Sequence, residues 1–341
     1  TVIHSRLAQL EWENEHEHCV IGHALLSQCP QLAKLADVVL HHHTHWSVLK
    51  NLNLPEETRL NASCIYLADR IDILTLGSLK DNSNILLGVP ETCRQAIEHK
   101  NEWFHPEIVE VFLELASSEA FWFRLESEHV AGYAATWVGC ESEGQLEFAD
   151  LRSLMHVFSV IVDAKSPYTQ RHSDAVARLA RFIGEKMGLS PRTCELLELA
   201  GLLHDLGKLR VPDNYLDKPG KLTQEEYAIV RRHSFDTFNI LKNISGLEEV
   251  AQWASQHHER IDGSGYPYHL QKAELSLEAR IIAVADVFQA LEQHRPYRGP
   301  LPAKDILNVL REEAELGKLD ADVVASVEAN LEQCWAVGFS K

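Results

Sequence analysis

The amino-acid sequence predicts an all-α fold of two tandem helical bundles, in which the N-terminal bundle is a degenerate copy of the C-terminal one. Apolar residues recur at three- and four-residue steps through most of the chain, which is the period of a helix. Strand-like alternation is scarce: we expect at most a small β-hairpin, at residues 129–138. The polar, turn-prone run 139–144 follows, so we predict two domains, 1–140 and 141–341.

The helices of the second half are the clearest elements. The apolar period predicts helices over 173–186, 192–203, 224–242, 278–291 and 303–314. Turn signals separate them at Gly188, at Gly220 and in the glycine-containing stretch 262–267. Thr223, followed three residues later by Glu226, predicts a capping box at the start of the third of these helices.

The two halves resemble each other at several spaced positions. In each half a histidine precedes a pair of adjacent histidines by 24 residues, and an aspartate follows in a similar apolar segment. The matching pairs are His18 with His233, His42 with His257, His43 with His258, and Asp69 with Asp286. Agreement at several spaced positions indicates duplication of one helical domain. The first copy has no counterpart of residues 168–210.

Composition narrows the class of protein. A chain of 341 residues can bury two ordinary cores, and 45% hydrophobic with 24% charged residues is typical of a soluble globular protein. No uninterrupted apolar run is long enough to span a bilayer, and the chain opens at Thr1 with no charged-then-apolar leader, so we expect neither a membrane span nor an export signal.

Charge and cysteine usage narrow the class further. A net charge of −18 disfavours broad binding to DNA or to an anionic membrane. The seven cysteines form no closely spaced pair, which argues against a zinc ribbon and a disulfide framework and favours a reducing cytosol. We therefore expect a cytoplasmic protein. Nineteen histidines are the unusual feature, and histidine is the commonest metal ligand.

Seven histidines and aspartates of the second half are candidates for one metal centre. They are His172, His204, Asp205, His233, His257, His258 and Asp286. Any one histidine alone is more often an ordinary side chain, but an adjacent His-Asp, an adjacent His-His and a later Asp on helices favour a site. Imidazole and carboxylate without thiolate suit two divalent transition-metal ions, with Fe or Mn first and Ni, Co or Zn as alternatives. Such a pair activates hydroxide for attack on a phosphodiester.

Three segments make a specific resemblance. They read HDLGKLRVPDNYLDKPGKLTQEE (204–226), HHERIDGSGYP (257–267) and ADVFQALEQHRPYR (285–298). In these segments the chain resembles the HD-GYP family of phosphodiesterases, an all-helical variant of the HD phosphohydrolase fold. The resemblance implies hydrolysis of cyclic di-GMP or 3′3′-cyclic GMP-AMP to the linear dinucleotide or to mononucleotides. A bacterial second-messenger pathway is implied with it.

The resemblance also implies roles for single residues. The seven candidates match the family's metal ligands, with Asp205 as the bridge between two ions. Lys208 matches the residue that holds the scissile phosphate, so Asp205 and Lys208 are the expected catalytic residues. Arg295 and Arg298 match positions that face the second phosphate or a guanine edge, and arginine suits bidentate phosphate contacts.

The GSGYP segment, residues 263–267, is expected to form a tight loop, because its two glycines permit positive φ. Tyr266 either packs under this loop or contacts the substrate. The family associates the loop with binding of protein partners, for instance diguanylate cyclases. A protein partner is therefore a second expectation beside the cyclic dinucleotide.

Two positions depart from the family's pattern. Tyr168 stands where some members carry a Glu and hold three metal ions, so two ions are expected here. Gln289 stands where members commonly carry Asp, which leaves the choice between cyclic di-GMP and cyclic GMP-AMP open. The alternative function is a low-turnover cyclic dinucleotide receptor that reports to a partner.

The first copy retains four of the matching residues but has no His-Asp dyad, no GYP loop and no RPYR run. We therefore expect a non-catalytic domain that packs against its sibling and is a candidate for a regulatory role. The run that contains His41, Thr44 and His45 is a weaker candidate for a single metal ion. The aromatic segment 112–123 is either the interface between the domains or core.

Overall fold

A computed structural model describes residues 16–79, 84–126, 129–130, 132–133, 136, 146–165, 172–216, 218, 220–293 and 299–339. Their backbone consists of helices, turns and connecting segments, with two isolated β-bridges, Lys100 to Phe104 and Asp262 to Gln271, among the described residues. Contacts between Cα atoms divide the chain into two compact units, Thr1–Asp150 and Leu151–Lys341. The predicted all-α class is confirmed.

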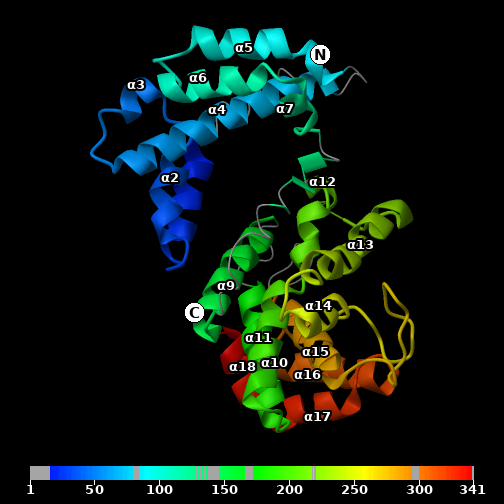
Figure 1. Ribbon diagram of the computed structural model, residues 1–341. Helices are drawn as coiled ribbons and strands as arrows, with labels where there is room; N and C mark the ends of the chain where they lie inside the picture. Colours follow the sequence, from blue (N-terminus) through cyan, green and yellow to red (C-terminus); the bar gives the residue numbers. More distant parts are fainter. Residues whose placement is uncertain are drawn as a thin grey trace. The chain divides into compact units, whose positions relative to one another are not determined.

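The first unit is a small helical bundle (Figure 1). Its first helix is described over residues 16–27. The helices that follow are α2 (Ala36–His41), α3 (Trp46–Leu49), α4 (Glu56–Leu79), α5 (Val89–Glu98), α6 (Pro106–Ala116) and α7 (Glu119–Phe123). Tyr66, Phe104, Phe112 and Trp122 form much of its core. The aromatic side chains of segment 112–123 thus contribute to this core, because α6 and α7 turn them towards α4.

The second unit holds the predicted helices, each with its ends within about one residue of expectation. Its elements are α9 (Phe148–Ala164), α10 (His172–Lys186), α11 (Pro191–Leu203), η3 (Leu206–Arg210), α12 (Asp213–Leu216), α13 (Gln224–Leu241), α14 (Glu248–Ser255), α15 (Leu277–Glu292), α16 (Ala303–Glu315), α17 (Ala321–Ala329) and α18 (Leu331–Phe339). The capping box of Thr223 and Glu226 is present at the start of α13.

Close contact between α10 and α11 positions the first ligand candidates. Gly201, near the end of α11, faces α10 so closely that a Cβ atom there would lie 2.5 Å from the Cα atom of Ala177. Only glycine permits that approach. The contact brings the first residue of α10, His172, next to His204, which directly follows α11.

The expectation of at most a small β-hairpin at residues 129–138 agrees with the fold, because the described residues of this stretch contain no strand. They are helical. The backbone N–H groups of His129 and Val130 donate to the carbonyl of Glu126. The sequence of this stretch is rich in alanine, which is a strong helix former. A helix forms its hydrogen bonds locally, whereas a strand needs a partner strand.

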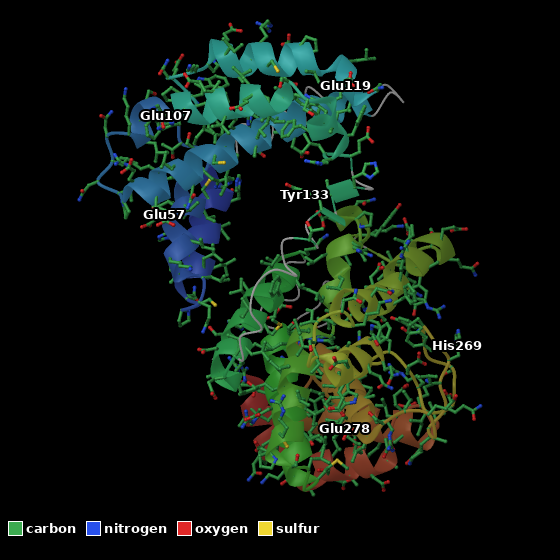
Figure 2. The ribbon with its side chains drawn as sticks, viewed as in Figure 1. Glu57, Glu107, Glu119, Tyr133, His269 and Glu278 are labelled. Atoms are coloured by element: carbon green, nitrogen blue, oxygen red, sulfur yellow. The ribbon has the colours of Figure 1, made fainter. Side chains whose placement is uncertain are left out.

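The acidic residues lie largely on the solvent side of the helices. Glu57, Glu107 and Glu119 are exposed and project from the first unit into solvent (Figure 2). Among the described residues, no helix combines the length and apolarity needed to cross a bilayer.

Candidate metal centre

The seven ligand candidates converge at one place in the second unit, although they come from five segments. His172 begins α10, His204 and Asp205 link α11 to η3, and His233 lies within α13. The adjacent pair His257-His258 lies in the turn after α14, and Asp286 lies within α15. Each of these side chains is buried except that of His258, which is half-buried.

Asp205 lies at the centre of this group. Its Oδ1 atom is 3.4 Å from Nε2 of His233 and 3.9 Å from Nε2 of His257. Its Oδ2 atom is 3.3 Å from Nε2 of His204. The two oxygens of one carboxylate thus face two different sets of imidazoles, which is the geometry of a bridging ligand.

The side chains form two sets on either side of Asp205. In one set, Oδ1 of Asp286 lies 3.2 Å from Nε2 of His172 and 3.9 Å from Nε2 of His204. In the other set, Nε2 of His233 lies 3.3 Å from Nε2 of His257. The ring of His258 lies edge-on to that of His233 and tilted against that of His257. Each set gathers three potential ligand atoms within 4.8 Å of one another.

Backbone carbonyls orient three of the imidazole rings. Nδ1 of His204 donates to Gly201 O over 2.8 Å, Nδ1 of His233 to Val230 O over 2.6 Å, and Nδ1 of His257 to Ala254 O over 2.7 Å. In each case the acceptor lies three residues earlier in the chain. In a neutral ring, a proton on Nδ1 leaves the lone pair on Nε2, directed towards Asp205, and such hydrogen bonds to Nδ1 fix the tautomer of metal-binding histidines.

Burial and neighbouring charges shift the pKa values of the histidines and of Asp205 in the centre. Burial lowers the pKa of His233 to about 4 and that of His257 to about 3, so both rings are neutral at physiological pH. Burial alone would raise the pKa of Asp205, but Lys208 and His204 hold it well below its usual range. His204 is the exception: burial lowers its pKa, but Asp205 and Asp286 outweigh burial and raise it to about 9.

The residues present fit two divalent transition-metal ions. Oδ1 of Asp205 and Nε2 of His204 are buried and make no hydrogen bond within the described part of the chain. Buried polar atoms ordinarily have a partner. Here both atoms lie among the other imidazole nitrogens and carboxylate oxygens of the centre, and this set of nitrogen and oxygen ligands suits transition metals.

Lys208 lies on η3, directly beside the centre. Its Nζ atom donates to Oδ2 of Asp205 over 2.5 Å, and its side chain keeps some exposure to solvent. A cation at this rim can reach a phosphate that approaches the metal ligands. Arg295, Arg298 and Tyr168 lie outside the described residues.

Tyr266 packs against the centre. Its ring lies 4.7 Å from the ring of His258, and its backbone N–H donates to His258 O over 3.2 Å. The guanidinium of Arg231 covers the ring at 4.5 Å. Of the two loop glycines, Gly263 has the expected positive φ of 80°. Gly265 serves close approach instead, because a Cβ atom there would lie 2.3 Å from Arg260 N.

Several supporting residues were not anticipated from the sequence. Oγ1 of Thr237 donates to His204 O over 3.1 Å and accepts from Gly207 N over 2.9 Å, which joins α13 to η3. The carboxylate of Asp163 accepts from both the backbone N–H and the hydroxyl of Ser173, next to His172. Thr237 follows His233 by four residues, so its helical spacing from a ligand candidate was the available sequence signal. No sequence pattern pointed to Asp163.

The carboxylate of Glu259 holds the loop that follows the His-His pair. Its two oxygens accept from Tyr268 N over 2.7 Å and Leu270 N over 3.0 Å. The side chain is 2% exposed and thereby ties the GSGYP loop to the end of the ligand turn. Its adjacency to the histidine pair was the only sequence signal.

In the first unit, His41, Thr44 and His45 do not assemble a metal site. Nδ1 of His41 lies 3.3 Å from Oγ1 of Thr44, whereas the ring of His45 stacks on that of Trp103 at 5.1 Å. Among the described residues of this unit, a different set of side chains gathers: His18, Cys19, His42 and His43.

Comparisons with known proteins identify similar chains of known activity. Residues 156–323 match the family model described as HD domain. The 3′3′-cGAMP-specific phosphodiesterase 1 of Vibrio cholerae is 37% identical over 338 residues, which cover 98% of this chain and 78% of that protein. A cyclic di-GMP phosphodiesterase of Thermotoga maritima is 36% identical over 190 residues, covering 55% of this chain and 51% of that protein.

A solved structure is similar as well. The crystal structure of a cyclic GMP-AMP-specific phosphodiesterase of Vibrio cholerae superposes with a TM-score of 0.58 at 29% identity, covering 92% of this chain and 71% of that chain. Similarity thus extends over both units and includes the segments that carry the ligand candidates. The chain therefore belongs to the HD-domain family of phosphodiesterases, of the HD-GYP type.

Proposed function

We propose that the protein is a cyclic dinucleotide phosphodiesterase that acts through the centre around Asp205. The observation that carries this proposal is the division of its ligand candidates into two sets joined by one bridging carboxylate. The relatives named above are phosphodiesterases of 3′3′-cGAMP and of cyclic di-GMP. Because the relative that matches nearly the whole chain is named for 3′3′-cGAMP, we propose this dinucleotide as the preferred substrate and cyclic di-GMP as the second.

The roles of the side chains follow from their positions. Two bound ions would polarise the phosphodiester and supply hydroxide for an in-line displacement at phosphorus. Asp205 spaces and holds the two ligand sets. The Nζ atom of Lys208 lies at the rim, where it donates to a phosphate oxygen and offsets the charge that develops during attack. A 3′-oxygen leaves, and the first product is the linear dinucleotide.

Loss of the bridge tests the proposal. Asp205→Asn keeps the side-chain volume but removes a negative charge from between the two ligand sets. We expect turnover of both dinucleotides to fall at least about 10²-fold, since loss of a residue that supports a metal centre typically has this effect. Products are followed by chromatography with chain reconstituted in turn with Fe²⁺ and with Mn²⁺.

The matched control is Asp305→Asn, because Asp305 is exposed in the first turn of α16. This variant should cleave at the wild-type rate. The proposal is wrong if wild-type chain loaded with metal cleaves neither dinucleotide. Tight binding without cleavage would instead favour the receptor function.

A further inference from the structure

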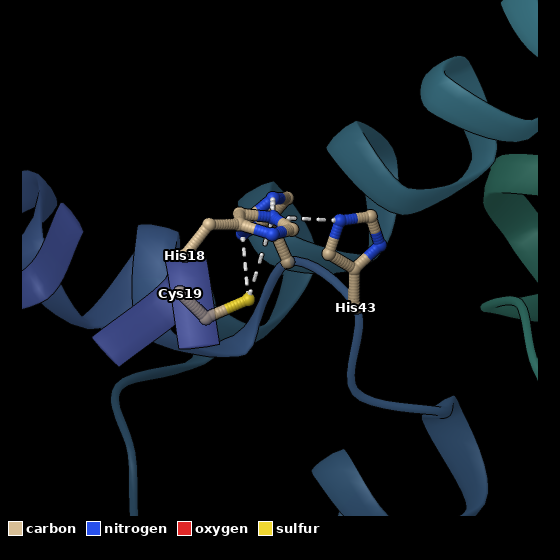
Figure 3. Close-up of side chains that lie close together, drawn as sticks. His18, Cys19 and His43 are labelled. Carbon is tan, nitrogen blue, oxygen red and sulfur yellow. Dashed lines mark hydrogen bonds between the residues drawn. The ribbon is translucent and has the colours of Figure 1, made fainter. Parts of the chain in front are cut away.

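The first unit contains a second cluster of histidines, made by His18, His42 and His43. The Nε2 atom of His18 lies 3.2 Å from Nε2 of His42 and 3.1 Å from Nε2 of His43. Figure 3 shows His18 and His43 pointing towards each other across the cluster, with Cys19 beneath it. We propose that these three Nε2 atoms bind a single divalent transition-metal ion, separate from the centre around Asp205.

Hydrogen bonding alone does not account for these contacts. A neutral imidazole nitrogen carries either one proton or one lone pair. Nε2 of His18 can therefore share a proton with only one of its two neighbours, although both lie within 3.2 Å. The remaining contact would set two lone pairs against each other. A cation between the three nitrogens removes that repulsion.

The tautomers favour a cation as well. Nδ1 of His42 lies 2.5 Å from Val39 O, three residues earlier, so it carries the proton and Nε2 carries the lone pair. Nδ1 of His43 is 3.9 Å from Oδ2 of Asp69, whose carboxylate is held by Arg70. A proton on Nδ1 of His43 is stabilised by that carboxylate, which leaves Nε2 free to bind.

The distances fit a metal ion. Zinc–nitrogen bonds of 2.0–2.1 Å at tetrahedral angles place ligand nitrogens about 3.3 Å apart. The observed separations of 3.1 and 3.2 Å lie close to this value. Three neutral imidazoles favour Zn²⁺, Co²⁺ or Ni²⁺ over Mg²⁺ and Ca²⁺, which prefer oxygen ligands.

The cluster reproduces one ligand set of the second unit. The corresponding residues are His18 with His233, His42 with His257, and His43 with His258. Within the first unit, the ring centroids of His18–His42, His18–His43 and His42–His43 are 5.1, 4.9 and 4.1 Å apart. The corresponding distances within the second unit are 5.3, 5.1 and 4.0 Å. The duplicated domain thus retains one half of the centre with its geometry intact.

Among the described residues of the first unit, one ligand set gathers. Asp69 corresponds to Asp286, but its carboxylate lies on the Nδ1 side of His43 rather than beside Nε2. The three Nε2 atoms of this set fit one ion. The thiol of Cys19 occupies the place of the hydroxyl of Ser234 beside the corresponding histidine.

The test uses the full-length chain, stripped with a chelator and titrated with Co²⁺. Metal analysis and the visible absorption of the bound cobalt are the readouts, so the result does not depend on phosphodiesterase activity. His42→Ala should bind about one equivalent less Co²⁺ than the wild-type chain, because three ligands are needed to hold the ion. This difference is independent of how many ions the second unit binds.

His41→Ala is the matched control. His41 directly precedes His42 but contacts Thr44 instead of the cluster, so this variant should bind as much Co²⁺ as the wild-type chain. His18→Gln provides a second ligand variant in case His42→Ala fails to fold, because His18 is exposed and its replacement leaves the core intact. Equal stoichiometry in the wild-type chain and both ligand variants would overturn the proposal, as would an equal loss in His41→Ala.

Discussion

Two buried carboxyl groups of the second unit behave oppositely because their neighbours differ. Asp205 is surrounded by cations and imidazoles, and Lys208 and His204 keep its pKa well below the usual range despite burial. Glu292 is 4% exposed, and both of its carboxylate oxygens lack a hydrogen-bond partner within the described part of the chain. Burial raises its pKa to about 7, with Arg178 as the opposing influence.

The raised pKa of Glu292 predicts a pH dependence of stability. Between about pH 4.5 and pH 7, Glu292 binds more protons in the folded chain than in the unfolded chain, so its contribution to the free energy of unfolding falls as the pH rises through this window. That contribution is about 3 kcal/mol, because each pKa unit corresponds to about 1.4 kcal/mol. The buried rings of His233 and His257 contribute a slope of opposite sign. Denaturant unfolding at a series of pH values should therefore show the effect of Glu292 as a difference in slope between the wild-type chain and Glu292→Gln.

Glu315→Gln is the control, since Glu315 is exposed at the end of α16. This substitution removes an exposed carboxylate and leaves Glu292 in place, so the pH dependence of the free energy of unfolding should match that of the wild-type chain. An unchanged slope in Glu292→Gln would show that another group titrates in this window.

At the level of elements, the centre depends on how closely η3 approaches α13. A Cβ atom on Gly207 would lie 1.9 Å from His233 O and 2.8 Å from Thr237 N. Glycine at this position therefore fixes the distance between Asp205 and Lys208 on one side and His233 on the other. The sequence motif contains this glycine, but no periodicity indicates why it is needed.

Gly207→Ala should separate the two elements. We expect destabilisation by about 1–3 kcal/mol or more, since the added methyl group meets backbone rather than a flexible side chain. Metal content and turnover should fall together, because His233 and Asp205 move apart. The measurements are denaturant unfolding and metal analysis, with Gly299→Ala as the control, since a Cβ atom there meets nothing within 4 Å. Wild-type metal content in Gly207→Ala would contradict this account.

The elements also show what sequence reasoning can reach. Helical periodicity and the capping box at Thr223 predicted the helices of the second unit, because each signal is local. The strand-like pattern at 129–138 corresponds to no strand among the described residues, since strand patterning means little without a partner strand. The seven ligand candidates could be named from motifs, whereas Asp163 and Glu259 act through backbone groups that only the folded chain brings near.

At the level of the whole molecule, each unit has its own core and its own group of metal-ligating residues. The repeat could be read from the sequence, because duplicated residues keep their spacing. The repeat also paired His18, His42 and His43 with ligand candidates of the second half. The expected metal site of the first unit was nevertheless placed on the run with His41, Thr44 and His45, because the stacking of His45 on Trp103 is a tertiary effect that the sequence does not show.

Metal should therefore stabilise each unit separately. Saturating metal at about 100 times its dissociation constant adds about 2.7 kcal/mol to the unit that binds it. We expect calorimetry to show two transitions that both move to lower temperature on chelation. In His42→Ala only the transition of the second unit should respond, and in Asp205→Asn chiefly that of the first. One transition that shifts equally in both variants would contradict independent units.

The short contact between Lys208 and Asp205 has a consequence for regulation by metal supply. Oδ2 of Asp205 accepts from the ammonium of Lys208 and also faces the imidazole of His204, so lysine and a metal ion compete for one oxygen. An ion bound at this oxygen would free the ammonium of Lys208 for a phosphate. Metal occupancy and affinity for a dinucleotide substrate would then be coupled, and such coupling is reciprocal. Scarcity of the metal would weaken capture of the substrate as well as its hydrolysis.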